Sequence, residues 1–313
     1  MEKKLGEKPG KYSRLTRREM ITRTSYALTG LTLAASCGPF SSGALGLRRA
    51  ESSRRGFKIG IVDWELGKKA DPSALELAER LGFDGVQVDL GGVEAMRRPE
   101  AQRRYLELAK RFDVEIASLA LGILNQVPYA SDPRGQELVD AGLDICQAMG
   151  LKVILLAFFG KGDLRKPENS IDALVERLKE IAPKAERAGV ELGVEAHISV
   201  EQYMDIIEGV GSPAVKVYFD MVHAHGKDRD VYQEITFLGE HICEFHAKDY
   251  GNIMFGQGDL DFKEVRRAMD DIGYRGWIQV EQWNEIKGEK PLGMEETNRR
   301  NLQYLRGIFP PEA

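Results

Sequence analysis

From Phe57 onward, short runs of apolar and β-branched residues alternate with longer segments whose apolar positions recur at helical spacing. Eight such pairs follow one another along the chain. Strands that alternate with helices in this way predict βαβ units and a parallel sheet. The predicted strands cover residues 57–62, 85–90, 115–121, 153–158, 191–195, 215–220, 242–247 and 277–281.

Helix stop signals recur just before several of these strands. A glycine after the last periodic residue is typical of the left-handed position that follows a helix C-terminus. The predicted helices cover residues 72–81, 99–112, 133–149, 171–188, 200–209, 231–238, 262–272 and 294–308. The stop signals are Leu81-Gly82-Phe83, Met149-Gly150-Leu151, Ala188-Gly189-Val190 and Ile272-Gly273-Tyr274. Their recurrence indicates one repeated supersecondary unit.

Eight βα units in 257 residues match the size of a (β/α)₈ barrel. A doubly wound open sheet, the other α/β arrangement considered, usually carries a glycine-rich phosphate loop after its first strand. Here the first predicted strand runs into Asp63-Trp64-Glu65-Leu66-Gly67, which is no such loop. The sequence therefore predicts an α/β fold of the TIM-barrel type, formed as one domain by residues 57–313.

The first 56 residues have a different character, with twelve Lys or Arg against four Asp or Glu. Within them, Thr16-Arg17-Arg18-Glu19-Met20-Ile21 precedes a weakly apolar run from Ser25 to Ala35 that holds no acidic residue. This order resembles a bacterial twin-arginine (Tat) signal peptide followed by a linker. It predicts engagement of the Tat export machinery and a periplasmic protein. A basic disordered tail is the alternative.

Two ways of processing such a signal are readable. Leu33-Ala34-Ala35-Ser36-Cys37 is similar to a lipoprotein signal and would anchor the protein by a lipid at Cys37, whereas Ser42-Gly43-Ala44 is similar to a peptidase site. Both remain open. Without the leader, the chain has 32 basic and 45 acidic residues, a formal charge near −13 that repels nucleic acid phosphates.

Polar residues close four consecutive predicted strands, namely Glu195, Asp220, His246 and Glu281. They are separated by 25, 26 and 35 residues, each close to one βα repeat, so they occupy equivalent positions on neighbouring strands. In a TIM barrel, the active site lies at the C-terminal ends of the strands. We therefore expect three carboxylates and one imidazole to meet at one mouth of the barrel.

A divalent cation is the simplest group that stabilises three acidic side chains held together. Ligation by several oxygens and a single His favours Mn²⁺, with Mg²⁺, Co²⁺ and Zn²⁺ as alternatives. The Tat route carries proteins that fold before export, which agrees with a metal loaded inside the cell.

Further polar and aromatic residues follow the strands. His197 stands two residues after Glu195, where it orients that carboxylate or contacts a substrate. Aromatic side chains that follow strands are candidates for the wall of a sugar pocket, because aromatic faces pack against sugar C–H groups. They are Trp64 and Trp283, together with Phe158, Phe159 and Phe255.

The strand ends resemble the sugar phosphate isomerase/epimerase superfamily, the xylose-isomerase-like barrels that include ketose 3-epimerases and the apurinic endonucleases. The resemblance covers the chain from about Phe57 to its end. It rests on Val194-Glu195, on Phe219-Asp220-Met221-Val222-His223, and on His246-Ala247-Lys248-Asp249 with the following Gly256-Gln257-Gly258-Asp259-Leu260-Asp261-Phe262.

The resemblance implies an enzyme of the EC 5 type, a metal-dependent sugar isomerase or epimerase that removes a proton and forms a metal-bound enediolate. It implies Glu195 and Glu281 as metal ligands and acid/base groups, and Asp220 and His246 as further ligands. His223 is implied to bind a substrate oxygen, and Lys248 to stabilise the enediolate charge.

Three positions depart from the family pattern. Asn252 stands where ketose 3-epimerases place an Arg, Gln87 where many relatives have Glu, and Glu244 where several have a second His. The implied substrate is thus a small sugar or polyol derivative whose identity the sequence leaves open.

Three other functions stay as alternatives, because one barrel fold hosts many chemistries. They are a lyase acting by the same proton abstraction, a non-catalytic carbohydrate-binding barrel, and a metal nuclease like the apurinic endonucleases. The nuclease needs a basic DNA groove and more His ligands, which the five His and the acidic charge oppose. A homo-oligomer is also compatible with the sequence.

Overall fold

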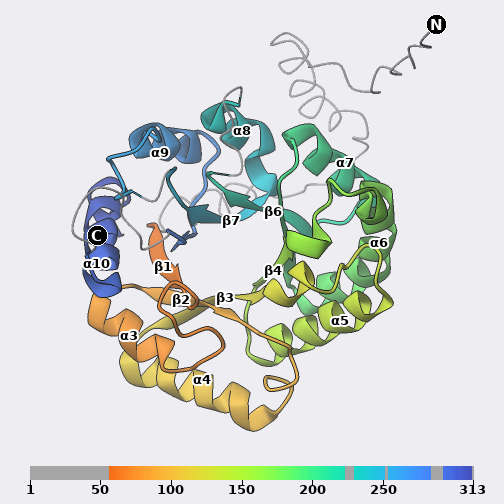
Figure 1. The fold of residues 1–313 in the computed structure, drawn as a ribbon, viewed down its shortest axis with the longest axis horizontal. Coiled ribbons are helices and arrows are strands. Elements are labelled where there is room, and N and C mark those ends of the chain that lie inside the picture. The colour runs from red at the N-terminus through yellow and green to blue at the C-terminus, as the bar shows by residue number, and fades with distance from the viewer. Residues whose placement is uncertain (1–55, 223–228, 251–252, 283–291, 312–313) are drawn as a thin grey trace, which may run out of the picture. The chain divides into compact units, whose positions relative to one another are not determined.

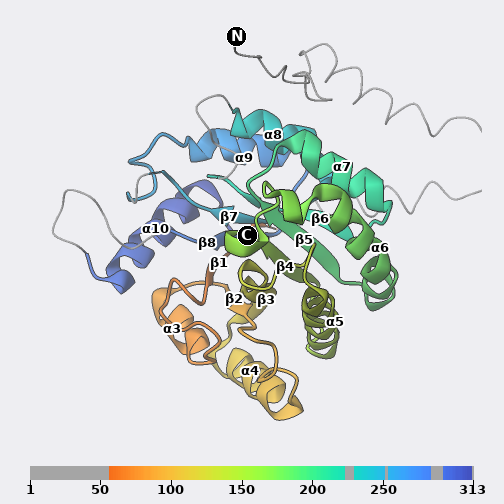
Figure 2. The same ribbon diagram turned by 45° about the vertical axis from the view of Figure 1, so that its right-hand side comes forward.

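The computed structural model describes residues 56–222, 229–250, 253–282 and 292–311. Its eight parallel strands close into a barrel in sequence order, with β1 paired to β8. Figure 1 shows the helices as an outer ring around these strands, and the turned view in Figure 2 shows the same arrangement. The predicted (β/α)₈ TIM barrel is confirmed.

The strands are β1 Lys58–Val62, β2 Gly85–Asp89, β3 Glu115–Leu121, β4 Val153–Phe158, β5 Glu191–Ala196, β6 Val215–Asp220, β7 Ile242–Ala247 and β8 Trp277–Val280. The helices are α3 Ala74–Leu81, α4 Pro99–Phe112, α5 Pro133–Ala148, α6 Ile171–Ala188, α7 Val200–Val210, α8 Val231–Leu238, α9 Phe262–Asp271 and α10 Met294–Ile308. Short 3₁₀ turns are η1 Gly122–Asn125, η2 Gly160–Gly162, η3 Pro167–Asn169 and η4 Gly239–His241.

The four predicted stop glycines, Gly82, Gly150, Gly189 and Gly273, all have positive φ angles, between 63° and 90°. Glycine reaches this region without the strain that a side chain would bring. Element ends agree with the prediction or differ from it by at most two residues. Glu281, predicted as the last residue of its strand, follows β8 instead, although its N–H still donates to the carbonyl of Ala247 on β7.

The ring of helices closes where the two ends of the barrel domain meet. Phe57 and Phe309 pack edge to face with ring centroids 5.2 Å apart. Arg306 on α10 forms an ion pair with Asp84, just before β2. Among the described residues, no helix combines the length and the apolar character that crossing a membrane requires.

Apolar side chains between the strands and the helices form the main core, which includes Ile59, Val88 and Phe245. The barrel interior is different, because it also contains polar residues with at most 2% exposure. These interior residues are Gln87, Ser118, Glu244, His246 and Gln279. Buried polar groups need hydrogen-bond partners. Hydrogen bonds therefore hold most of these interior side chains in place below the C-terminal mouth of the barrel.

Candidate metal centre

Four consecutive strands bring the four expected side chains together at the C-terminal mouth of the barrel. Glu195 lies near the end of β5, Asp220 ends β6, His246 lies on β7, and Glu281 follows β8. One donor atom from each lies within 4.8 Å of those from the other three. Three of the residues are buried and Glu281 is partly exposed, so the group opens toward solvent on one side.

His246 contacts two of the three carboxylates. Its Nδ1 lies 3.0 Å from Oε1 of Glu195 and 3.3 Å from Oε2 of Glu281. Lys248 Nζ lies 3.2 Å from Oε2 of Glu281 and 3.9 Å from Oδ2 of Asp220. The other carboxylate oxygen of Glu281, Oε1, accepts a hydrogen bond from the indole N–H of Trp64 at 3.1 Å. The two predicted residues Lys248 and Trp64 thus touch the site directly.

The charges of this group influence one another. Burial lowers the pKa of His246, but the carboxylates of Glu195 and Glu281 outweigh it and raise that pKa to about 9. Burial also lowers the pKa of Lys248, and Glu281 and Asp220 again outweigh it and raise the pKa above its usual range. Protonated His246 and Lys248 therefore offset much of the carboxylate charge. Repulsion alone, the reason given from the sequence, does not require a metal.

The donor set provides the stronger argument for a cation. Three carboxylates and one imidazole match the ligands of Mn²⁺ and related divalent ions. Ligands on opposite sides of an ion held at about 2.1 Å are about 4.2 Å apart. Donor atoms within 4.8 Å of one another need only a small closure to reach that spacing. We find no second group of this kind among the described residues.

A cavity of about 490 Å³ opens beside the candidate metal centre, and Glu195 and Glu281 form part of its wall. Trp64 and Phe159 supply aromatic surface. At another part of the wall, Lys69 Nζ lies 3.2 Å from Oδ2 of Asp89. The cavity thus combines a candidate metal centre, aromatic faces and polar groups, which suits a small hydroxylated molecule.

The other predicted residues have different outcomes. His197 packs edge to face on Phe159, with ring centroids 4.8 Å apart, so it supports the cavity wall. The expectation for Phe158 and Phe255 is wrong, because their rings are at most 4% exposed and pack in the core against Tyr129 and Phe262. His223, Asn252 and Trp283 lie outside the described residues.

Several cavity residues escaped the sequence analysis. Glu65 is one, and burial together with the charge of Glu281 raises its pKa to about 8. Asn125 is another, and its Oδ1 accepts a hydrogen bond from the N–H of Phe159 at 2.8 Å. Asp89 ends β2 and Glu65 follows β1 closely. A search for polar residues at the C-terminal ends of the first two strands would have found Asp89 and Glu65.

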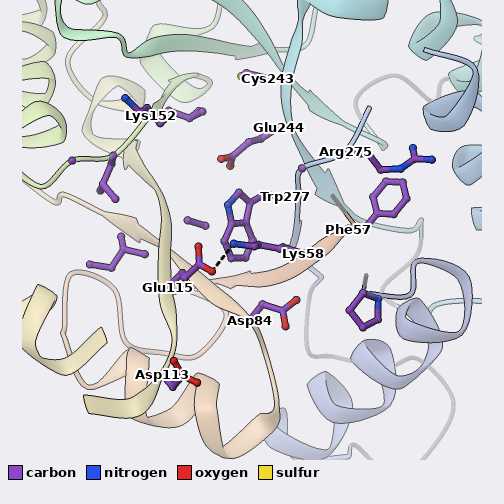
Figure 3. A pocket seen from close by; sticks show the side chains of 18 residues that line it. Phe57, Lys58, Asp84, Asp113, Glu115, Lys152, Cys243, Glu244, Arg275 and Trp277 are labelled. Carbon is purple, nitrogen blue, oxygen red and sulfur yellow. Dashed lines mark hydrogen bonds and ion pairs between the residues drawn. The ribbon is translucent and has the colours of Figure 1, made fainter. Parts of the chain in front are cut away.

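A larger cavity of about 880 Å³ lies at the opposite, N-terminal end of the barrel. Lys58 and Glu115 form an ion pair there, and Trp277 and Glu244 lie beside them (Figure 3). The volume of a cavity does not show which of the two is the candidate active site. Known TIM-barrel active sites lie at the C-terminal ends of the strands, where the clustered carboxylates and imidazole are found.

Comparison with known proteins identifies the family. A family model described as xylose isomerase-like TIM barrel matches residues 75–307. L-ribulose-5-phosphate 3-epimerase UlaE of Salmonella paratyphi A is 26% identical over 231 residues, which cover 67% of this chain and 81% of that protein.

Two solved structures show the same fold. D-psicose 3-epimerase of Clostridium cellulolyticum H10, determined with D-tagatose, matches with a TM-score of 0.68 and 17% identity, over 81% of this chain and 99% of that one. The 3-keto-D-glucoside 4-epimerase YcjR of E. coli matches with a TM-score of 0.66 and 18% identity, over 80% and 99%. Because the family model spans well over half of the sequence, the chain belongs to the xylose isomerase-like TIM barrel family.

Proposed function

We propose that this protein is a divalent-metal-dependent epimerase or isomerase of a small sugar or sugar derivative. The observation that carries the proposal is the pair Glu195 and Glu281, which both contact Nδ1 of His246 and both border the same cavity. The relative UlaE is named a ribulose-phosphate 3-epimerase, and the two structural neighbours are named sugar epimerases, which supports this reaction class.

Epimerisation next to a carbonyl group requires removal of a carbon-bound proton and its return to the opposite face. Two carboxylates that border one cavity suit this task, with Glu195 and Glu281 exchanging the roles of base and acid. A bound divalent cation supplies Lewis-acid polarisation of the substrate oxygens. Mn²⁺ fits the oxygen-rich donor set best, and Mg²⁺, Co²⁺ and Zn²⁺ are the other candidates.

The neighbouring residues assist these carboxylates. Trp64 donates to Glu281 and fixes its orientation, while its ring borders the cavity. Lys248 places an ammonium group 3.2 Å from Glu281, where it stabilises negative charge that develops on the substrate. His223 and Trp283 keep their proposed substrate-binding roles, and His197 acts on the wall through Phe159.

Exchange of solvent hydrogen into a panel of free and phosphorylated ketoses tests the reaction class. In D₂O with Mn²⁺, we expect deuterium at one carbon beside the carbonyl group of the true substrate, together with the epimer or isomer, detected by mass spectrometry and NMR. An unsaturated product would instead identify a lyase. Saturable sugar binding without any exchange would identify a non-catalytic barrel and contradict the proposal.

We also propose that residues 1–56 form a Tat signal and linker and that the barrel domain, residues 57–313, acts in the periplasm, with a lipid at Cys37 as one form of the mature protein. Support comes from the order of Arg17-Arg18, the apolar run and the small residues. Fractionation and intact mass of the mature protein test this. A full-length protein found only in the cytoplasm would contradict it.

A further inference from the structure

Four buried polar side chains lie inside the barrel beside His246. Gln87 on β2 is in register with Ser118 on β3, and Tyr218 on β6 is in register with Glu244 on β7. All four side chains have at most 2% exposure. Hydrogen bonds link the two pairs across the barrel, since the amide of Gln87 reaches Tyr218 and the hydroxyl of Ser118 reaches Glu244.

The directions of these hydrogen bonds follow from the number of protons available. The hydroxyls of Ser118 and Tyr218 both donate to Oε2 of Glu244, at 2.7 and 2.9 Å. A hydroxyl has one proton, so each can only accept from its remaining neighbour. That neighbour is the amide of Gln87.

The side-chain amide of Gln87 therefore has only one satisfying orientation. Its NH₂ group donates to the hydroxyls of Ser118 and Tyr218, at 3.0 and 2.8 Å. Its Oε1 consequently faces His246, at 2.8 Å from Nε2. A carbonyl oxygen accepts but cannot donate, so the proton of this contact belongs to Nε2 of the imidazole.

We infer that Gln87 is a positioning residue that keeps a proton on Nε2 of His246, so that Nδ1 is the nitrogen that loses its proton and offers its lone pair when a cation binds. This inference rests on the metal site of the proposed function. The same Nδ1 faces Glu195 and Glu281. A ligating histidine commonly donates its other N–H to an oxygen acceptor, and loss of that acceptor typically weakens metal binding about 10–100-fold.

Two departures from the family pattern are explained together by this chain of bonds. Gln87 and Glu244 are joined through two hydroxyls, and the hydroxyl protons that point to Glu244 leave lone pairs for the amide of Gln87, whose oxygen then faces His246. Glu244 lies two residues before His246 on the same strand. Glu244 thus helps to orient His246, the candidate metal ligand on the same strand, through hydrogen bonds with side chains of β2, β3 and β6.

Gln279 provides a matched control. It lies on β8, in register with His246, and is fully buried like Gln87. Neither its Oε1 nor its Nε2 has a hydrogen-bond partner among the described residues. Gln279→Leu therefore removes the same amide from the same region without removing a bond to the imidazole.

Manganese affinity, measured by EPR of free Mn²⁺, tests the inference in the full chain. Gln87→Leu should raise the Mn²⁺ dissociation constant roughly 10–100-fold. Gln87→Glu should restore most of the affinity, because a carboxylate also accepts from Nε2–H and one hydroxyl can turn its proton toward it. Gln279→Leu should bind Mn²⁺ like the native protein.

A second measurement needs no variant of Gln87, so it remains decisive if Gln87→Leu does not fold. In the native protein with a diamagnetic ion, ¹⁵N NMR of labelled histidines should show His246, assigned by its absence in His246→Asn, protonated at Nε2. Protonation at Nδ1, or folded Gln87→Leu protein with native affinity, would overturn the inference alone. Native protein that binds no divalent ion would overturn the metal site as well.

Discussion

Glu281→Gln is expected to lower turnover by roughly 10²–10⁴-fold, the usual contribution of a general acid/base group, and to leave the fold intact. An amide cannot take up the substrate proton, and it is a poorer cation ligand than a carboxylate. The fold should survive because Glu281 is partly exposed, and a glutamine Oε1 still accepts from the indole N–H of Trp64. Turnover on the sugar identified by deuterium exchange and the circular dichroism spectrum provide the two readouts.

Glu115→Gln is the matched control, because Glu115 borders the larger cavity at the other end of the barrel. Its ion pair with Lys58 is exposed, so its loss should cost at most about 1 kcal/mol of folding stability. We expect native turnover. Full activity in Glu281→Gln together with lost activity in Glu115→Gln would place the chemistry at the N-terminal cavity and refute the proposed site.

Removal of the metal is expected to abolish turnover, and Mn²⁺ should restore it. Without an ion, the proton on Nδ1 of His246 and the ammonium group of Lys248 hold the carboxylates of Glu195 and Glu281 in ion pairs. These pairs occupy the groups that must accept the substrate proton. Protein dialysed against a chelator should therefore stay folded and inactive, as measured by deuterium exchange before and after addition of Mn²⁺.

Thermal unfolding gives an independent measure of the same metal. A ligand that binds only the folded state at 100 times its dissociation constant stabilises it by about 2.7 kcal/mol. For a domain of this size, that corresponds to a rise in Tm of roughly 5–10 °C. Asp220→Asn should reduce this rise, because the variant loses one charged ligand. Chelated protein with full turnover would contradict metal dependence.

The positions of the candidate ligands could be predicted because they follow from a simple repeat. Glu195, Asp220, His246 and Glu281 each stand at or just beyond the end of a strand, and a parallel barrel brings such ends to one mouth. The apolar runs and the stop glycines located the strands and helices well enough to place these four residues at equivalent strand ends. Local sequence was therefore sufficient for the fold class and for the gathering of these four side chains.

Contacts across the barrel could not be predicted in the same way. The bond from Gln87 to Tyr218 joins residues 131 positions apart, and no local pattern indicates it. The ion pair of Lys248 with Glu281 also depends on the closed barrel. Phe158 ends β4 and Phe255 lies in the loop after β7, yet both rings pack in the core, whereas Phe159 borders the cavity. The direction of a side chain at a strand end depends on the loop that follows it.

Anomalous X-ray diffraction at the manganese edge from crystals grown with Mn²⁺ locates the bound ion itself. One strong anomalous peak is expected, enclosed by Glu195, Asp220, Nδ1 of His246 and Glu281. A crystal of the folded barrel with no peak among these four side chains, or with the manganese bound elsewhere, would contradict the proposed metal site.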